Sequence, residues 1–410
     1  MKLSLIITMG MKLIVRICIV PTMFPKYKGD YYGSFVFDDA KELVKNGFEV
    51  HVVTQHNPGI PYEEIMEGVN VHRFKWLEPK EFKALVHFKG FIDNLRLITY
   101  LFSLFFNLIW IVRKFDVDII HTHSVIPTGL IGVIISKIIR KPVFITVHGM
   151  DVTNFENNPI YERFISFSLK NCNKVIAVSE YLANIIISFG PNQDNIIILR
   201  NAVDQKRFRP YRNKKLCKQY KINDENIVIL FVGYLDEFKG IFELVDAFFE
   251  ISTNNKNLKL MVIGTGPKED QLKMKVMNLG LEKSVIFTRE IPPSEIHEYY
   301  QSADIFVLPS YTDAGGPPLV FIEAMACGLP VIGTDVGGIP EGIENGINGF
   351  IIPAKNVDEL AKKLNILSED ENLRKEFGNN SLKKIRENSM TLEMKTEKLI
   401  NLYNNQIKNL

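Results

Sequence analysis

The stretch Pro309–Gly333 constrains the fold of this chain more than any other segment. The apolar run Ile305–Leu308 before it predicts a short buried strand, which ends at a proline. The glycine pair Gly315-Gly316 then closes a turn-rich loop, and two prolines begin a helix that we predict over Leu319–Cys327. A second apolar strand follows the glycine and proline that end this helix. The order strand, loop, helix, strand predicts a parallel β-α-β unit.

The predicted helix begins with backbone groups that suit an anion. The first-turn N–H groups, such as those of Leu319 and Val320, have no partner inside the helix, so a phosphate can accept hydrogen bonds from them. Glu323 lies one turn further along and can accept hydrogen bonds from a pair of sugar hydroxyls. An ordinary β-α-β turn with Glu323 in solvent is the alternative interpretation.

Two strings in this half of the chain carry a family resemblance. They are Glu323-Ala-Met-Ala-Cys-Gly-Leu-Pro-Val-Ile-Gly-Thr-Asp-Val-Gly-Gly-Ile-Pro-Glu341 and Asn345-Gly-Ile-Asn-Gly-Phe-Ile-Ile-Pro353. They resemble the donor-binding half of glycosyltransferase family 4, the group 1 glycosyl transferases. The resemblance implies a retaining enzyme that uses a nucleotide-activated sugar. It also implies an α/β fold of the GT-B type, in which two Rossmann-like doubly wound domains face each other across a cleft.

Chain length predicts two domains, because 410 residues exceed the roughly 250–300 at which a single core stops growing. We predict an N-terminal acceptor-side domain over residues 11–203 and a nucleotide-sugar-binding domain over residues 204–388. By the resemblance, a last helix over residues 389–410 crosses back to the first domain. Residues 1–10 are expected to be an extension, because a second Met-Lys-Leu begins at Met11 and favours a later start.

Composition and motifs exclude some classes of function. The net charge of +2, from 49 basic and 47 acidic residues, argues against a nucleic-acid-binding protein. Four widely spaced cysteines without a Cys-x-x-Cys pair predict reduced, buried thiols in a cytoplasmic protein. Asp116-Val-Asp118 spells a metal-binding motif, but it precedes the strand Ile119–His121, whereas ligands gather beyond the carboxyl ends of parallel strands. We therefore predict a solvated turn there, and no metal site.

Residues that follow predicted strands of the N-terminal half supply further candidates. His148 and Asp151 follow the strand Val143–Val147 and resemble the His-Gly-x-Asp segment of the family. In that segment the histidine approaches the transferred sugar and the acidic residue orders the loop. A histidine satisfied within the core is the alternative for His148. His121 and His123 also lie at a strand end, where they are expected to line the cleft or to cap the end of the strand.

A glycine loop follows the first predicted strand, Leu13–Val20. In the family the matching loop approaches the donor phosphates and the acceptor, and Gly33 is the residue that carries over. Most glycine loops with this spacing are merely turns, which is the alternative. We expect Ser34 to be the N-cap of the helix that follows.

The loop Gly233–Gly240 departs from the family pattern, in which an arginine and a lysine together clamp the diphosphate. Lys239 is present, but Tyr234 stands where the arginine is expected. A cation ~4 Å from a phosphate contributes roughly 4 kcal/mol gross at an effective dielectric near 20. One neutral hydrogen bond from Tyr234 is worth only about 0.5–1.5 kcal/mol net. Arg289, which follows a Val-x-Phe strand, is one candidate for a compensating residue, and weak donor binding is the alternative.

A second departure lies at Gly315, where the family usually has the first glutamate of a pair. Some members carry Asp-x-Gly-Gly instead, which matches Asp313-Ala-Gly-Gly316. Asp313 is therefore expected to contact the sugar. Gly316 and the amides of Leu319 and Val320 are expected to contact the donor.

The apolar run Leu97–Val112 is too short and too polar to span a bilayer, which takes ~20 residues. Lysines and arginines flank it. The region Phe82–Lys114 is therefore either a helix buried against the sheet or a surface that contacts an anionic membrane peripherally.

The resemblance implies a hexosyltransferase that needs neither a metal nor a cofactor, and the cysteine pattern predicts that it is cytoplasmic. It takes a sugar from a UDP-, GDP- or ADP-sugar to an acceptor hydroxyl in surface polysaccharide, lipid-linked or glycoprotein glycan synthesis. Lys239 neutralises the leaving diphosphate, Glu323 holds the ribose, and three residues orient the sugar: His148, Asp151 and Asp313.

Two alternatives remain open. One is a GT-B-fold epimerase that acts on a nucleotide sugar. The other is a binding protein or inactive homologue, which the substitutions at Tyr234 and Gly315 keep open and the presence of Lys239 and Glu323 opposes.

Overall fold

The computed structural model describes residues 14–79, 90–155 and 158–409. The expected extension 1–10, the start of the predicted first strand and residues 82–89 of the predicted membrane surface lie outside the described residues. The described chain divides into two compact units. Unit 1 contains the described residues up to Val178, Leu182–Leu199 and the chain from Thr396; unit 2 contains Ser179–Tyr181 and Arg200–Lys395.

Unit 1 is built on one sheet of eight strands among the described residues, in the order β3-β4-β2-β1-β5-β6-β7-β8. All neighbours pair in parallel except β3, which runs antiparallel to β4 at one edge. The strands are β1 (Arg16–Pro21), β2 (Glu49–Gln55), β3 (Glu63–Met66), β4 (Val69–Phe74), β5 (Ile119–His123), β6 (Val143–Val147), β7 (Lys174–Ala177) and β8 (Ile196–Ile198). The helices are α2 (Ser34–Lys45), α3 (Phe91–Lys114), α4 (Leu130–Ile139), α5 (Met150–Thr153), α6 (Pro159–Asn171), α7 (Glu180–Ser188) and α16 (Leu392–Lys408), of which α7 and α16 also contribute residues to unit 2.

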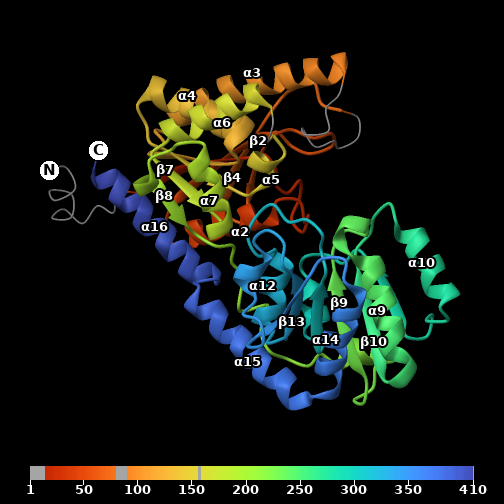
Figure 1. Ribbon diagram of the computed structural model, residues 1–410. Helices are drawn as coiled ribbons and strands as arrows, with labels where there is room; N and C mark the ends of the chain where they lie inside the picture. The colour runs from red at the N-terminus through yellow and green to blue at the C-terminus, as the bar shows by residue number, and fades with distance from the viewer. Residues whose placement is uncertain (1–13, 80–89, 156–157, 410) are drawn as a thin grey trace. The chain divides into compact units, whose positions relative to one another are not determined.

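Side-chain alternation along the strands of unit 1 creates two cores. Ile17 and Ile19 of β1 pack with α2 and with Leu399 and Tyr403 of α16. Cys18 and Val20, which point the other way, pack with α3, α4, α6 and α7. Figure 1 shows α3, α4 and α6 on one side of this sheet and α2 and α16 on the other. Burial of both faces explains why these strands are nearly continuous apolar runs.

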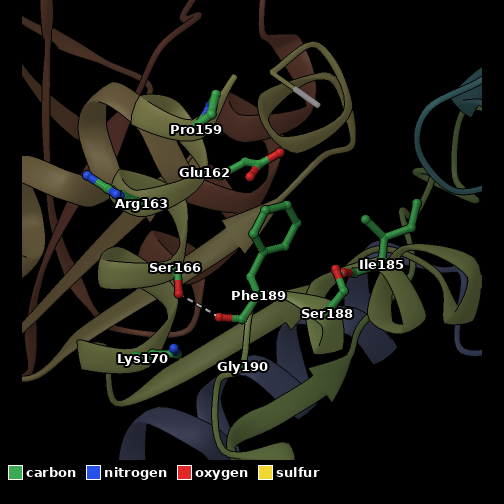
Figure 2. Close-up of a pocket in the computed structure, with 9 residues that line it drawn as sticks. All are labelled: Pro159, Glu162, Arg163, Ser166, Lys170, Ile185, Ser188, Phe189 and Gly190. Atoms are coloured by element: carbon green, nitrogen blue, oxygen red, sulfur yellow. Dashed lines mark hydrogen bonds between the residues drawn. The ribbon is translucent and has the colours of Figure 1, made fainter. Parts of the chain in front are cut away.

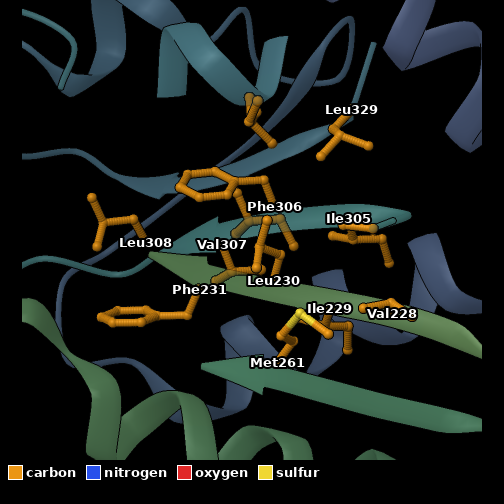
Figure 3. Close-up of a cluster of buried hydrophobic side chains, with 14 of the residues drawn as sticks. Val228, Ile229, Leu230, Phe231, Met261, Ile305, Phe306, Val307, Leu308 and Leu329 are labelled. Atoms are coloured by element: carbon orange, nitrogen blue, oxygen red, sulfur yellow. The ribbon is translucent and has the colours of Figure 1, made fainter. Parts of the chain in front are cut away.

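Unit 2 has a second sheet, of six parallel strands among the described residues, in the order β11-β10-β9-β12-β13-β14. The strands are β9 (Ile227–Val232), β10 (Leu258–Ile263), β11 (Val285–Arg289), β12 (Ile305–Leu308), β13 (Val331–Thr334) and β14 (Gly349–Ile352). The helices are α8 (Lys214–Gln219), α9 (Ile241–Asn254), α10 (Glu269–Asn278), α11 (Ile296–Tyr300), α12 (Leu319–Ala326), α13 (Ile339–Gly342), α14 (Val357–Glu369) and α15 (Glu371–Glu387). Figure 3 shows side chains of the central strands β9, β10 and β12 packed together, among them Phe231, Met261 and Phe306.

Strand order places a switch point in each unit. Across each sheet, apart from the edge strand β3, the strand numbers first fall and then rise, and the change occurs between β1 and β5 in unit 1 and between β9 and β12 in unit 2. Ligands of open parallel sheets bind beyond the carboxyl ends of the strands at such a point. The loops that follow these four strands are therefore the places to look for a site.

Helix α3 differs from the prediction. It spans 24 residues rather than the 16 of the apolar run, and it is long and apolar enough to cross a membrane by length and composition. The argument that it is too short to span a bilayer was therefore wrong. Only 28% of its most apolar window is buried, so the prediction of a well-buried helix was also wrong for its outer face. Its inner face packs in the core of unit 1 through residues such as Tyr100, Leu104 and Leu108.

The structure also tests two smaller predictions, on the N-cap of α2 and on the cysteines. Ser34 was expected to be an N-cap but is the first residue of α2, because Gly33 holds the cap position in a left-handed conformation at φ 71°. All four cysteines are free and buried, as predicted.

Candidate active site

Two loops meet at the switch point of unit 2. The segment Gly233–Gly240 follows β9, and the loop from Pro309 follows β12. The amide of Tyr311 donates to the carbonyl of Phe238 at 2.8 Å. Gly240 has φ 68°, and a Cβ there would lie 2.0 Å from the carbonyl oxygen of Pro309. Because backbone packs directly on backbone, the position of Gly240 requires glycine.

Lys239 is the last residue of a 3₁₀ turn within the first of these loops. Its ammonium makes no hydrogen bond, and no ion pair within 4.0 Å, with any residue that the structure describes. Burial lowers the pKa of Lys239, and the nearby Asp313 opposes that shift. Burial likewise raises the pKa of Asp313, against the hydrogen bond from the Gly315 amide and the charge of Lys239. The ammonium lies 5.4 Å from the centre of the Phe238 ring. A partly buried cation without a hydrogen-bonded or ion-paired partner is the feature that most needs an anion here.

The loop Asp313–Gly316 is held by a second glycine pair. A Cβ on Gly337 would lie 2.0 Å from the Asp313 carbonyl oxygen, and one on Gly338 would lie 2.3 Å from that of Gly315. Gly337 also has φ 57°. The Val-Gly-Gly string of the sequence therefore allows close backbone packing, which fixes the loop that carries Asp313.

Helix α12 begins directly after this loop. The amides of Phe321 and Ile322 donate to the carbonyl of Pro318. No hydrogen bond from the amide of Leu319 or Val320 occurs among the described residues. The sequence predicted that these two N–H groups at the helix start bind an anion, and neither is occupied by a described residue.

Glu323 lies one turn into α12, half-buried. One of its carboxylate oxygens accepts a hydrogen bond from the hydroxyl of Tyr300 at 2.7 Å. Tyr300 is fully buried, and burial together with the adjacent Glu323 carboxylate raises its pKa well above the ordinary value, so it stays a donor. Tyr300 therefore holds Glu323 in one orientation.

Tyr234 and Arg289 lie at the carboxyl ends of β9 and β11. Tyr234 is 52% exposed, and Arg289 is exposed with a positive φ of 61°. Gly264 lies between them, since its amide donates to the carbonyl of Arg289 and a Cβ on it would lie 2.0 Å from the carbonyl oxygen of Gly233. A non-glycine residue at positive φ is unusual and marks Arg289 as a residue worth testing.

The predicted residues of unit 1 lie near its switch point. Both oxygens of Asp151 accept backbone hydrogen bonds: one from His148 (3.1 Å) and Gly149 (2.9 Å), the other from Val125 (2.9 Å). Burial raises the pKa of Asp151 despite these bonds. These contacts match an acidic residue that orders the loop.

His148 is positioned by side chains on two elements. Its Nε2 lies 3.2 Å from Nδ1 of His123 at the end of β5. The ring of Phe35 on α2 meets its ring edge-on at a centroid distance of 5.1 Å. Gly33 is the N-cap of α2, and a Cβ there would lie 2.3 Å from the carbonyl oxygen of Met23, so the close approach of backbone requires glycine.

The Asp-x-Asp motif lies elsewhere. Asp116 and Asp118 follow α3 and precede β5, at the opposite end of that strand from His123. Asp116 forms an ion pair with Lys141 at 3.0 Å, and Asp118 accepts the amide of Arg16. No group of three or more potential metal ligands occurs among the described residues.

A cavity of about 760 Å³ lies elsewhere in unit 1, between α6 and α7. Figure 2 shows its lining, including Arg163, Lys170 and Phe189, with the Ser166 hydroxyl donating to the Phe189 carbonyl. None of the predicted site residues lines it. It is not the site that the sequence predicted.

Sequence reasoning missed two side chains of these sites, Ser310 and Tyr300, and assigned no partner to His123. The Ser310 hydroxyl is fully buried and has no hydrogen-bond partner among the described residues, next to the Pro309 carbonyl that contacts Gly240. Tyr300 and His123 each hold a predicted site residue. The strand end at His123 was a signal for that residue, whereas no local pattern identifies Tyr300.

Two family models match the chain: residues 33–207 match Glycosyltransferase Family 4 and residues 213–384 match Glycosyl transferases group 1. The capsular polysaccharide biosynthesis glycosyltransferase CapM of Staphylococcus aureus is 30% identical over 292 residues, which are 68% of this chain and 75% of that protein. The chain belongs to glycosyltransferase family 4. This confirms the family that the two glycine-rich strings predicted, and it makes the protein a glycosyltransferase enzyme.

Other relatives of this glycosyltransferase cover nearly the whole chain. N-acetyl-alpha-D-glucosaminyl L-malate synthase of Bacillus anthracis is 26% identical over 385 residues, 93% of this chain and 94% of that protein. Sucrose-phosphate synthase from Thermosynechococcus elongatus has a TM-score of 0.79 at 20% identity, covering 97% of this chain and 100% of that chain. Anabaena Alr3699/HepE in complex with UDP has a TM-score of 0.75 at 19% identity, covering 95% and 100%. These structures confirm the predicted α/β fold of the GT-B type, with two parallel-sheet domains.

Proposed function

We propose that this family 4 glycosyltransferase transfers a sugar from a nucleoside diphosphate sugar to an acceptor hydroxyl, with retention of the anomeric configuration. The observation that carries the proposal is Lys239, whose partly buried ammonium has no hydrogen-bond or ion-pair partner among the described residues. It lies in a backbone-packed loop at the switch point of unit 2, where ligands of such sheets bind. A diphosphate supplies the missing negative charge.

The donor contacts of the proposal come from unit 2. Lys239 offsets the charge that develops on the leaving diphosphate, and the amides of Leu319 and Val320 donate hydrogen bonds to it. Glu323, oriented by Tyr300, accepts hydrogen bonds from the ribose hydroxyls. These groups supply the positive charge without a resident metal or cofactor, so the proposal assigns neither.

Sugar positioning is divided among a few residues. Asp313 and Gly316 contact the sugar end of the donor from the loop before α12. His148 hydrogen-bonds a sugar hydroxyl, and Asp151 orders the loop that carries it. Gly33 allows the loop before α2 to approach substrate closely. The guanidinium of Arg289 supplies part of the positive charge that an arginine at position 234 would provide and Tyr234 does not.

The donor class has support from similar structures. Anabaena Alr3699/HepE was solved with UDP, with UDP and glucose, and with UDP-glucose. At 19% identity this likeness favours a nucleotide-sugar donor for our protein and leaves UDP, GDP and ADP as bases to test. The relative CapM, named for capsular polysaccharide biosynthesis, favours surface polysaccharide among the acceptor pathways, with lipid-linked and glycoprotein glycans as alternatives.

The outer face of α3 supports peripheral membrane contact from the cytoplasmic side. Seven of its large apolar side chains are 43–83% exposed: Phe91, Ile92, Leu95, Ile98, Phe102, Phe106 and Trp110. Arg113 and Lys114 end the helix, and the Lys114 ammonium lies 4.2 Å from the centre of the Trp110 ring. An apolar face with aromatic rings and a basic end suits the interface of an anionic bilayer. In the proposal, such contact keeps the enzyme at the membrane surface, where a lipid-linked acceptor is held.

Equilibrium binding tests the donor assignment. We expect purified protein to bind one of UDP, GDP or ADP in titration calorimetry. Lys239→Ala should weaken that binding about ten- to hundredfold, because a hydrogen bond to a charged group is worth about 1.5–3 kcal/mol. Lys362→Ala, which removes an exposed lysine on α14, should leave it unchanged. Equal affinity of Lys239→Ala and the unmodified protein would contradict the assignment.

A further inference from the structure

The cavity between α6 and α7 has no role in the proposed function. It has a volume of about 760 Å³ and lies along α6 from Pro159 to Lys170, with the end of α7 as its other wall (Figure 2). The hydroxyl of Ser166 on α6 donates to the carbonyl of Phe189, just after α7, at 2.7 Å. This hydrogen bond joins the two walls. We call the cavity the α6–α7 groove.

One end of the α6–α7 groove lies at the edge of the sheet that carries His148. Strands β6 and β7 pair in parallel, so α6, which connects them, runs back from the carboxyl end of β6 to the amino end of β7. Pro159 at the start of α6 therefore lies at the same edge as His148, which follows β6. Lys170 lies at the opposite edge. The groove thus leads away from the edge where we place the transferred sugar.

Two cations, Arg163 and Lys170, lie along the groove. Both side chains are exposed, and neither makes a hydrogen bond or an ion pair with any residue that the structure describes. They are seven residues apart on α6, which is two turns, or about 10 Å along the axis. A Cβ on Gly190 would lie 2.7 Å from Cε of Lys170, so this glycine leaves room for the lysine stem. One small anion cannot meet both charges, whereas a chain with spaced negative charges can.

The rest of the lining suits a sugar chain. The hydroxyls of Ser166 and Ser188 donate to backbone carbonyls at 2.7 and 2.6 Å, so their oxygens face a ligand as acceptors. The carboxylate of Glu162 also lines the groove, and Figure 2 shows the ring of Phe189 extending toward it. Sugar hydroxyls can donate to these oxygens, and the C–H face of a sugar can pack on the ring. A densely charged polyanion is disfavoured by Glu162.

We propose that the α6–α7 groove binds the acceptor, and that this acceptor is a glycan chain with spaced acidic groups. Its carboxylates or phosphates meet Arg163 and Lys170, and one of its sugars packs on Phe189. The proposal rests on the proposed function, because it assigns the bound glycan as the acceptor of the transfer. Contacts far from the reacting hydroxyl hold the ground state and the transition state equally, so the groove lowers KM for the acceptor and leaves kcat unchanged.

Binding of an acidic oligosaccharide tests the groove without any donor. We expect a galacturonic acid hexamer to bind the unmodified protein in titration calorimetry, and more weakly at high salt. The methyl ester of the same hexamer, which is neutral, should bind at least tenfold more weakly. Arg163→Gln with Lys170→Gln should weaken binding of the acid about tenfold, because each exposed ion pair contributes little. No binding of the acid, or equal binding of the ester, would overturn the proposal.

A matched variant controls for net charge. Lys375→Gln with Lys383→Gln removes two exposed cations, eight residues apart, from α15 of unit 2. We expect this variant to bind the hexamer as the unmodified protein does. An equal loss of affinity in the α15 and groove variants would overturn the proposal. So would a glutamic acid hexapeptide that binds as tightly as the sugar hexamer, because the site would then select charge and not a glycan.

Transfer kinetics separate this proposal from the proposed function. With an acidic oligosaccharide as acceptor, Arg163→Gln with Lys170→Gln should raise KM for the acceptor about tenfold at unchanged kcat. Affinity for the nucleoside diphosphate should also stay unchanged, because its contacts come from unit 2. Transfer with an unchanged KM, or transfer to neutral acceptors alone, would overturn the proposal and leave the proposed function standing. Binding in the groove without transfer to any acceptor would remove the proposed function and with it the acceptor assignment.

Discussion

Lys239 illustrates how a single residue can carry a site. Burial of an ammonium without a hydrogen-bonded partner is unfavourable, and the fall in its pKa reflects that cost. Asp313 offsets part of it, but no ion pair within 4.0 Å forms among the described residues. An anionic ligand removes the cost, so part of the binding energy comes from a charge that the fold leaves unsatisfied.

The lowered pKa of Lys239 gives donor binding a pH dependence. A lysine whose pKa lies below the ordinary 10.5 loses its proton at a lower pH than an exposed lysine does. The neutral amine no longer offsets the charge of a diphosphate, so affinity should fall as the pH rises from about 7 to about 10. Calorimetric titrations of the nucleoside diphosphate over that range measure this loss.

Lys239→Arg is the matched control for that titration, because a guanidinium stays charged throughout the range. We expect the Lys239→Arg variant to bind the nucleoside diphosphate more weakly at neutral pH, because the planar guanidinium fits a lysine site less well. Its affinity should not fall as the pH rises. An alkaline loss of the same size in the arginine variant would assign the pH dependence to another group.

Gly240 allows a test of the loop packing. In Gly240→Ala the left-handed conformation costs about 1–2 kcal/mol, and the new Cβ, 2.0 Å from the Pro309 carbonyl oxygen, adds a clash with backbone. We expect the free energy of unfolding in urea to fall by more than about 2 kcal/mol. Gly280→Ala has nearly the same φ, 69° against 68°, but open space around the Cβ, so it isolates the conformational cost. Equal losses in the two variants would contradict the close approach.

Among single residues, the sequence pointed to site candidates that belong to strings with fixed spacing, such as Lys239, Glu323 and Gly33. It did not identify Tyr300, which lies 23 residues before its partner Glu323 on another helix. Nor did it assign a partner to His123, because the contact depends on the register of β5 against β6. Contacts of this kind exist only once the sheet has formed.

Among the elements, α3 and α12 show what local patterns can reveal. Helix α12 begins at Leu319 as predicted, because prolines and glycines mark both of its ends. Helix α3 begins at Phe91, six residues before the predicted run, because Asp93, Asn94 and Arg96 interrupt the apolar pattern there without ending the helix. Strand β3, with two glutamates, was not predicted; it is an edge strand, where polar residues are common. The outer face of α3 was therefore identified only from the exposed fractions of its side chains in the structure.

Vesicle binding tests the outer face of α3. We expect the protein to sediment with vesicles that contain an anionic phospholipid, and less with zwitterionic ones or at high salt. Phe102→Glu with Phe106→Glu should abolish binding without loss of stability, since both side chains are more than 60% exposed. Met274→Glu with Met277→Glu places the same charges on exposed positions of α10 in unit 2 and should have no effect. Unchanged binding of the α3 variant would exclude this face as the membrane contact.

For the whole molecule, the two parallel sheets were predictable because both of their faces are buried. Strands such as Val143–Val147 and Val228–Phe231 read as continuous apolar runs, and glycine and proline mark the loops between them. The family strings then identified the fold, which the similar structures confirm. What the strings do not encode is which base, sugar and acceptor are used, because acceptor contacts come from loops that vary within one fold.

The most direct test of the account is the release of a nucleoside diphosphate. Purified protein is incubated with UDP-, GDP- and ADP-sugars and a panel of glycan and lipid-linked acceptors, with EDTA present. The account predicts release from donors of one base, dependent on an acceptor, maintained in EDTA and lost in Lys239→Ala. Release that needs a divalent cation, or that persists in Lys239→Ala, would contradict it. So would interconversion of the sugar without release, and so would binding of a donor with no release for any acceptor.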